Sequence, residues 1–300
     1  MTMSSSRSRF AYSALVTASI VWGGSVVAQK VALGPFSVVE VSVFRGLGAL
    51  LILIPLWWWQ EKSSTVWNSS DWSLLTVLGL GVAGNHLLIL YGLQFIGAGT
   101  AGVIIGASPA ITALLSSMIL KDVPFGKVWL GCAVSFVGVA LVSGAQASDG
   151  AGSNSLLGGI LVILALVSWA LYTIGSRRMM DRLSPLTVNW TTLLISILIQ
   201  IPLLWTGHKA IDAGIESISL SGWMALGYVI VFATALGQQA WLYGVSHIGP
   251  SRAGIFTNLI PVSSLLLSFM ILGESLNVMK VMGIGLVLGG VWLVNRSTKA

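Results

Sequence analysis

Long apolar runs separated by short polar stretches make up almost the whole chain. Each run is about 20 residues long, which is the length that an α-helix needs to cross ~30 Å of hydrocarbon. Such a pattern is typical of an all-α integral membrane protein, because a helix satisfies its own backbone hydrogen bonds in lipid. The runs predict ten transmembrane helices: Phe10–Leu33, Ser37–Trp58, Trp72–Phe95, Thr100–Leu120, Pro124–Ala145, Leu156–Met179, Pro185–Trp205, Ser221–Ser246, Arg252–Leu272 and Leu276–Val294.

One polar stretch, Gln146–Ser155, divides these ten helices into two sets of five. It is rich in Ser, Gly and Ala, as flexible linkers are. We therefore expect a first five-helix unit over residues 10–145, a linker over 146–155 and a second five-helix unit over 156–294.

The two units resemble each other in sequence. A shift of 152 residues aligns Leu90–Val142 with Leu242–Val294 without gaps, with 19 identities in 53 positions, among them a Tyr, a Pro and several spaced Gly. Five is an odd number of crossings, so the second unit must enter the bilayer from the opposite side. This predicts two inverted repeats with a substrate site between them near the midplane. A duplicated bundle without a cavity is the alternative.

Two prolines favour a pathway over a packed bundle. Pro109 and Pro261 occupy equivalent positions in the middle of the fourth and ninth predicted helices. Each proline removes a helical hydrogen bond and is expected to kink its helix. Kinked or broken helices commonly line the pathway in folds built from inverted repeats.

Composition and charge fit the same class of protein. The chain is 55% hydrophobic and 8% charged, against roughly 25% charged residues in soluble domains, which leaves no soluble catalytic domain. If the N-terminus is cytoplasmic, eleven Lys and Arg lie on the inner side and three on the outer side, as the positive-inside rule requires. Both termini are therefore predicted to be cytoplasmic. The net charge of +6 is spread over helix ends and forms no patch for nucleic acid.

Several kinds of chemistry are missing from the sequence. The Asp and Glu residues lie in loops or at the ends of predicted helices, and Glu40 lies within a turn of such an end. There is no His-Glu-x-x-His or Gly-x-Ser-x-Gly motif, and Cys132 is the only cysteine. We therefore expect neither an enzyme nor a bound cofactor or metal.

Several motifs together resemble a known superfamily. They are a Trp-Gly pair in the first helix (Trp22-Gly23), an arginine in the second (Arg45), and a Gly…Ala-Gly…Pro pattern in the fourth and ninth. With ten helices in two halves, the chain resembles the drug/metabolite transporter superfamily, in particular its EamA-type branch. The abundance of Trp is most similar to the YddG-type aromatic amino-acid exporters. The resemblance implies export of small metabolites through a cavity that opens alternately to either side, in a bacterial inner membrane.

A few polar side chains inside the predicted helices are candidates for binding substrate. Arg45 is the one permanent charge well inside a helix, and it must face protein or water because a charge in lipid is costly. It could bind substrate or tie helices together. Asn85 and His86, in the middle of the third helix, and Gln238, at a matching level of the eighth, could contact substrate or a neighbouring helix. Asn258, shortly before Pro261, has the same two interpretations.

Three aromatic residues form the second group of candidates. Most tryptophans lie at helix ends, as interfacial anchors do. Trp22 and Trp169 lie instead in the middle of the first helix of each half, and Tyr172 lies on the same face as Trp169. Together they could line an aromatic cavity suited to flat rings, or they could simply pack helices together.

We thus predict a secondary transporter that exports small metabolites, above all aromatic or hydrophobic amino acids, by alternating access. Its partners would be a small-molecule substrate and the lipid bilayer, without nucleic acid, as a monomer or weak homo-oligomer. One alternative is a broad-specificity carrier of drugs or other metabolites. Another is a membrane scaffold or receptor that transports nothing.

Overall fold

A computed structural model describes residues 5–61, 68–119, 130–131, 133–135, 137–138, 141, 154–207, 209–249, 253–275 and 277–297 of the chain. The regular elements in these ranges are helical, and no strand occurs in them. The predicted all-α class is therefore confirmed. The helices of the first half are α1 (Ser5–Ala32), α2 (Val38–Gln60), α3 (Asp71–Phe95), α4 (Ala98–Ile105) and α5 (Ser108–Ile119).

Over the residues described, the second half of the chain contains more helical elements than the first, several of them short. They are α7 (Ser155–Met179), α8 (Pro185–Gln200), η2 (Ile201–Thr206), α9 (Lys209–Ala213), η3 (Ile215–Ser217), α10 (Leu220–Tyr228), η4 (Val229–Gly237), α11 (Gln238–Ile248), η5 (Gly254–Asn258), α13 (Leu259–Leu267), η6 (Ser268–Leu272) and α14 (Val278–Ser297). The segments η4 and η6 are π-helices, and the other η segments are 3₁₀ helices.

Within the described ranges, seven helical segments are long and apolar enough to cross a membrane. They are Arg9–Ala32, Val38–Gln60, Asp71–Phe95, Ala98–Ser116, Ser155–Met179, Pro185–Thr206 and Leu220–Ile248. Two shorter apolar helices, Phe256–Leu272 and Val278–Gly290, lie where the ninth and tenth were predicted. Most of the fifth predicted helix, Pro124–Ala145, and most of the linker lie outside the described residues. The count of ten and the inverted repeat therefore stay predictions.

Local sequence signals fix where helices begin and end. At α2, the Ser37 hydroxyl accepts from the Glu40 N–H (3.2 Å), and the Glu40 carboxylate accepts from the Ser37 N–H (2.7 Å). This capping box satisfies two backbone donors that a helix start leaves unpaired. At α8 the Ser184 hydroxyl accepts from the Thr187 N–H (3.0 Å), and Pro185 follows in the first helical position, which suits it. Gly249 ends α11 at φ 82°, a conformation that side chains with a Cβ disfavour.

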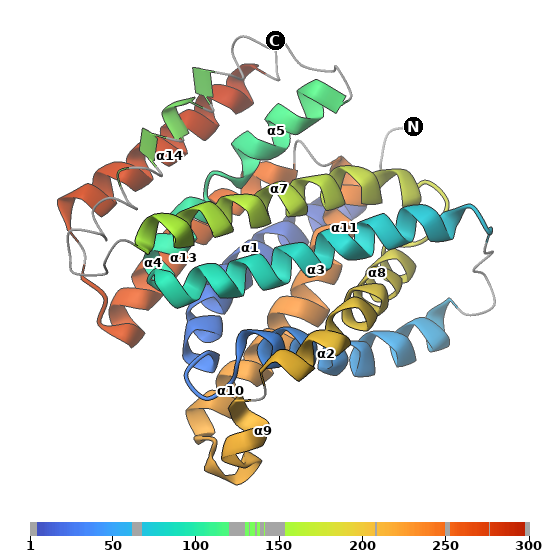
Figure 1. The fold of residues 1–300 in the computed structure, drawn as a ribbon. Coiled ribbons are helices and arrows are strands. Elements are labelled where there is room, and N and C mark those ends of the chain that lie inside the picture. Colours follow the sequence, from blue (N-terminus) through green and yellow to red (C-terminus); the bar gives the residue numbers. More distant parts are fainter. Residues whose placement is uncertain are drawn as a thin grey trace.

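Small residues allow the helices to approach each other closely. In Figure 1, α3 and α7 run side by side along much of their length, and a Cβ on Gly92 of α3 would lie 2.7 Å from the Val162 side chain of α7. A Cβ on Gly102 of α4 would lie 1.6 Å from Ser264 Oγ of α13. Close packing of small residues is how helices associate in lipid, where apolar burial alone provides little driving force.

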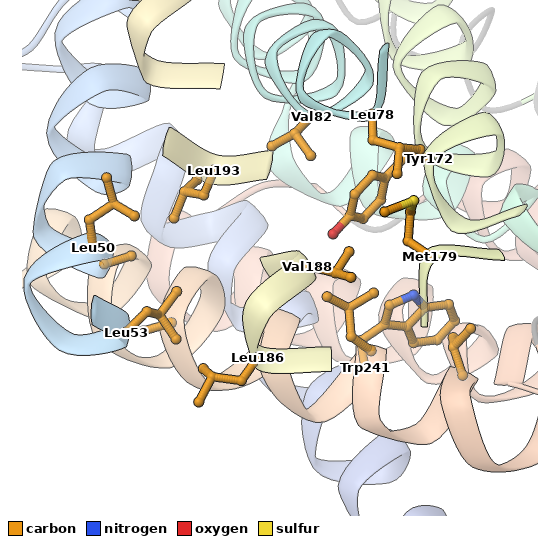
Figure 2. Close-up of a cluster of buried hydrophobic side chains, with 14 of the residues drawn as sticks. Leu50, Leu53, Leu78, Val82, Tyr172, Met179, Leu186, Val188, Leu193 and Trp241 are labelled. Carbon is orange, nitrogen blue, oxygen red and sulfur yellow. The ribbon is translucent and has the colours of Figure 1, made fainter. Parts of the chain in front are cut away.

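The outside of the bundle is apolar. Leu51, Leu198 and Met270 are 78%, 59% and 76% exposed, on three different helical segments. A water-soluble protein would cover such side chains, whereas lipid solvates them. Inside, the largest core cluster joins α1, α2, α3, α7, α8 and α11, and Figure 2 shows part of it, with Tyr172 and Trp241 packed among aliphatic side chains.

Candidate functional site

A cavity lies between the first five helices and the second half of the chain. Its volume is about 80 Å³. The polar and aromatic side chains that line it are Trp22, Ser25, Gln29, Arg45, Asn85, His86, Ser108, Trp169, Gln238 and Thr257, and apolar residues complete the wall. This volume holds several water molecules or a small solute, but it is below the ~300–1,000 Å³ typical of ligand pockets.

Three tryptophans cluster at the site, and two of them, Trp22 and Trp169, line the cavity as its aromatic wall. The ring of Trp22 meets that of Trp169 edge to face, with centroids 5.3 Å apart, and lies 5.3 Å from the ring of Trp241. The rings of Trp169 and Trp241 are 6.2 Å apart. Such aromatic pairs hold each other in fixed orientations. The cluster joins α1 of the first half to α7 and α11 of the second. A role of Trp22 and Trp169 in binding substrate stays a prediction.

The π-helix η4 supplies polar groups beside this wall. A π-helix shifts the backbone hydrogen bonds by one residue, and such segments are frequent at functional sites. The carbonyl of Ala233 accepts a hydrogen bond from Trp22 Nε1 (3.0 Å). Thr234 Oγ1 donates to the Val229 carbonyl five residues earlier (2.7 Å) and accepts from Arg45 Nε (3.0 Å). The widened helix therefore holds Trp22 and Arg45 in place.

Arg45 lies in α2 and points into the bundle. It is 7% exposed and lines the cavity. Its NH1 group donates to Gln29 Oε1 (3.2 Å), and Gln29 in turn donates to the Ser25 carbonyl (3.1 Å). The arginine thus contacts neutral side chains of α1 and η4, and it does not extend outward to the membrane surface.

Asn85 and His86 approach the cavity from α3. Asn85 Nδ2 donates to the Ala165 carbonyl of α7 (2.9 Å), so this side chain also joins the two halves. His86 is 3% exposed, and its Nδ1 is buried without a hydrogen-bond partner. A buried polar atom without a partner costs free energy unless something binds it. His86 is therefore the member of the pair that is open to a ligand.

The other three predicted site residues fall at different depths. Gln238 lines the cavity, and its Nε2 donates to the Tyr172 hydroxyl (3.3 Å). Tyr172 is 1% exposed and belongs to the core cluster of Figure 2; its ring lies 5.2 Å from that of Trp169, behind the cavity wall. Asn258 does not line the cavity, although its neighbour Thr257 does, and its Oδ1 is buried without a partner.

The two prolines stand where their helices are interrupted. Pro109 is the second residue of α5, after the break that follows α4, and Pro261 is the third residue of α13, after the 3₁₀ segment η5. A Cβ on Gly106 would lie 2.8 Å from the Pro261 ring, and one on Gly254 would lie 3.8 Å from Pro109 Cβ. Each proline therefore packs against the interrupted segment of the opposite half.

Several site residues were missed by the sequence analysis. Trp241 packs behind the aromatic wall, against Trp22 and Trp169, and its position three residues after Gln238, on the same helix face, is a signal that could have found it. Gln29 lies sixteen residues before the arginine that it contacts. Ser25, Ser108 and Thr257 also line the cavity, but short hydroxyl residues are too common in membrane helices to be singled out by sequence.

Polar contacts tie the two halves together at the end of the bundle where α3 ends and α4 begins. The Glu274 carboxylate accepts from the N–H groups of Ala98 (2.7 Å) and Gly99 (3.0 Å) at the start of α4. Lys30, near the end of α1, donates to the carbonyls of Leu93 and Ile96 (3.0 Å to Ile96). We call the contact of Glu274 with Ala98 and Gly99 the Glu274 latch.

The opposite end is held by a different set of contacts. Arg182 Nη1 lies 2.8 Å from the Asp71 carboxylate at the start of α3. The Glu61 carboxylate, just after α2, accepts from the hydroxyls of Ser184 and Thr187, the latter at 3.0 Å, at the start of α8. Both ends of the cavity thus lie under interactions that cross from one half to the other.

Comparison with known proteins places this geometry in a family. The model of the EamA-like transporter family matches residues 9–144 and again residues 156–296. The uncharacterized transporter YyaM of Bacillus subtilis is 31% identical over 284 residues, covering 93% of this chain and 92% of the relative. YetK of the same organism, also an uncharacterized transporter, is 28% identical over 286 residues, covering 94% and 86%.

A more distant relative and a solved structure are also similar to this chain. The uncharacterized inner membrane transporter YedA of Escherichia coli is 24% identical over 285 residues, covering 94% of this chain and 90% of the relative. One crystal structure superposes with a TM-score of 0.67 over 98% of both chains, at 16% identity. At that identity the likeness shows the fold alone.

Proposed function

Since the chain belongs to the EamA-like transporter family, it is a membrane transporter, and we propose that it exports amino acids, above all aromatic and hydrophobic ones. The aromatic wall of Trp22 and Trp169, which lines a cavity with a few polar groups, carries the proposal. Flat rings stack on tryptophan, and the polar groups fix the orientation of the rest of the substrate. The relatives support a bacterial inner membrane location.

We further propose that transport proceeds by alternating access between two inverted repeats, residues 10–145 and 156–294. The cavity is lined from both halves, and the interrupted helices meet beside it, with each proline against the opposite half. The present volume is too small for a ring-bearing amino acid, so binding requires the two halves to move apart. Breaking the contacts at one end while keeping those at the other would admit substrate from one side.

Flux through proteoliposomes tests this proposal. We expect purified protein to move phenylalanine and tryptophan down a gradient faster than alanine, and faster than protein-free liposomes do. His86→Ala should slow all three without changing their order, because it removes a polar contact and leaves the aromatic wall intact. Equal rates for alanine and the aromatic amino acids would contradict the substrate class. No flux of any amino acid would contradict amino-acid export itself.

A control variant separates the wall from general effects of removing tryptophan. Trp59, at the end of α2, is 82% exposed and does not line the cavity. Trp59→Ala should keep the wild-type order of substrates, whereas Trp22→Ala should lower the rates for aromatic amino acids more than the rate for alanine. Equal effects of the two substitutions would contradict a role of Trp22 in the site.

A further inference from the structure

Arg45 is a buried charge without a charged partner in the part of the chain that the structure describes. Its two side-chain contacts are neutral, Thr234 Oγ1 at 3.0 Å and Gln29 Oε1 at 3.2 Å. The ion pairs among the described residues, Arg177–Asp181 and Arg182–Asp71, lie elsewhere. Among the described residues, the side chains that line the cavity include no Asp or Glu. The cavity therefore has a net positive charge.

The cost of this arrangement needs an explanation. Taking a charge out of water costs several kcal/mol per ion even after relaxation, and two neutral acceptors recover only part of that. A tie between α1, α2 and η4 could be made by a neutral amide donor, which would avoid most of the cost. A guanidinium has five N–H donors in a planar fork, and the two contacts above use two of them. The positive charge of Arg45 and its remaining N–H donors are thus available to a ligand.

A second buried group points to the same ligand. His86 lines the cavity with Arg45, and its Nδ1 has no partner. Gln238, from α11, faces the cavity as well. An anionic group beside Arg45 would neutralise the charge, and polar atoms on the rest of the ligand would find hydrogen-bonding partners in His86 and Gln238.

We propose that Arg45 is the anion-binding group of the cavity and that the transported class is organic carboxylates, including amino acids, with organic cations excluded. This inference rests on the proposed function only in taking the cavity as the transport site. Arginine suits the role because its fork matches both oxygens of a carboxylate. The described residues of the cavity wall, which include no acidic side chain, give a cation no opposite charge to replace its hydration.

Three ligands that share a phenyl ring test the charge preference. They are 3-phenylpropionate, with a carboxylate alone, phenylalanine, with a carboxylate and an amine, and phenethylamine, with an amine alone. We expect 3-phenylpropionate and phenylalanine to raise the Tm of the purified full-length protein, and phenethylamine to bind at least about tenfold more weakly, the factor that one charge-assisted hydrogen bond provides. Equal binding of all three, or binding of none, would overturn the inference.

Two substitutions then assign the preference to Arg45. Arg45→Met should weaken the binding of 3-phenylpropionate by about tenfold or more. This ligand should then bind no more tightly than phenethylamine. Arg45→Lys should keep the preference with lower affinity, because an ammonium cannot form the two parallel hydrogen bonds. Arg178→Met, which removes a charge from an exposed position at the end of α7, is the control and should bind like the wild type. An unchanged preference in Arg45→Met would assign Arg45 to helix packing.

Phenylalanine flux in proteoliposomes separates this inference from the proposed function. Arg45-dependent binding of 3-phenylpropionate without phenylalanine flux would support the anion site and contradict amino-acid transport. Flux of phenylalanine with equal flux of phenethylamine would support transport and overturn the anion site. If Arg45→Met does not fold, the order of affinities for the three ligands, measured in the wild type and in Arg45→Lys, still tests whether Arg45 binds the carboxylate.

Discussion

Neutralising Glu274 should open the end of the bundle that the Glu274 latch closes. The latch joins the segment after η6 to the start of α4, with both carboxylate oxygens accepting backbone N–H groups, at 2.7 Å from Ala98 and 3.0 Å from Gly99. Those N–H groups have no acceptor within their own helix, because the first turn of a helix leaves its donors unpaired. Glu274→Gln keeps the length of the side chain, but its NH₂ group cannot accept the second hydrogen bond.

The expected magnitude follows from these contacts. Loss of one capping hydrogen bond costs ~0.5–2 kcal/mol, and loss of a negative charge at a helix N-terminus costs a further ~0.3–1 kcal/mol. Together they shift the equilibrium by about 1–3 kcal/mol, or roughly 5- to 150-fold, toward the form in which the latch is broken. The bundle should stay folded, since the close contact of α4 with α13 at Gly102 does not involve the carboxylate.

Amide hydrogen exchange measures the latch directly. In nanodiscs, a peptide that contains Ala98 and Gly99 should exchange about 5- to 150-fold faster in Glu274→Gln, because its exchange follows the opening free energy. A cysteine in place of Ser108, which lines the cavity, should react faster with a thiol reagent in the same background, with Cys132 replaced by alanine. Glu216→Gln, at an exposed site on η3, is the matched control.

Hydrogen exchange and cysteine labelling each have a result that would refute the proposed role of Glu274. If the exchange of Ala98 and Gly99 is the same in Glu274→Gln, Glu216→Gln and the wild type, the carboxylate does not hold this end closed. If exchange rises but the labelling of Ser108→Cys does not, the latch opens without giving access to the cavity. Its role in alternating access would then be wrong.

Three further predictions follow from the same site. Trp169→Ala should slow flux of large aromatic amino acids more than flux of alanine, with Trp59→Ala as control; an equal loss for all substrates together with a lower Tm would make Trp169 a packing residue. Pro109→Ala and Pro261→Ala should insert normally but transport several-fold more slowly, because each change allows a continuous helix where the break now lies; wild-type flux in both would contradict this. Ser5→Cys, in a protein without Cys132, should resist a membrane-impermeant thiol reagent in intact cells, since the positive-inside rule places the N-terminus in the cytoplasm; rapid labelling would reverse the topology.

The helical class of the fold could be predicted from the sequence because hydrophobicity is a local property. A run of about 20 apolar residues must form a helix in lipid wherever it lies in the chain, since nothing else there satisfies its backbone. Helix bounds followed for a similar reason: Ser37 and Ser184 cap the helices that begin beside them. The break after α4 lies beside Pro109, where the sequence predicts an interruption.

The candidate site could be predicted only in part. Trp22, Arg45 and His86 were found because a polar or aromatic side chain in the middle of an apolar run is unusual, and the structure brings them to one cavity. Tyr172 shows the limit of that reasoning: it shares a helix face with Trp169 but lies in the core behind the wall. Spacing along a helix gives the face, whereas the rotation and depth of the helix decide what that face meets.

The sequence by itself determined that this chain is a bundle of membrane-crossing helices with two similar halves, because both properties can be read from the order of residues. Only the tertiary structure decided which residues meet inside the bundle. Arg45 contacts Thr234 across 189 positions, and Glu274 reaches Ala98 across 176. Trp241 is one more apolar residue in the sequence and meets Trp22 and Trp169 only when α11 packs against α1 and α7. Contacts at such separations depend on how whole helices turn and tilt against each other, which close packing of many small residues determines together.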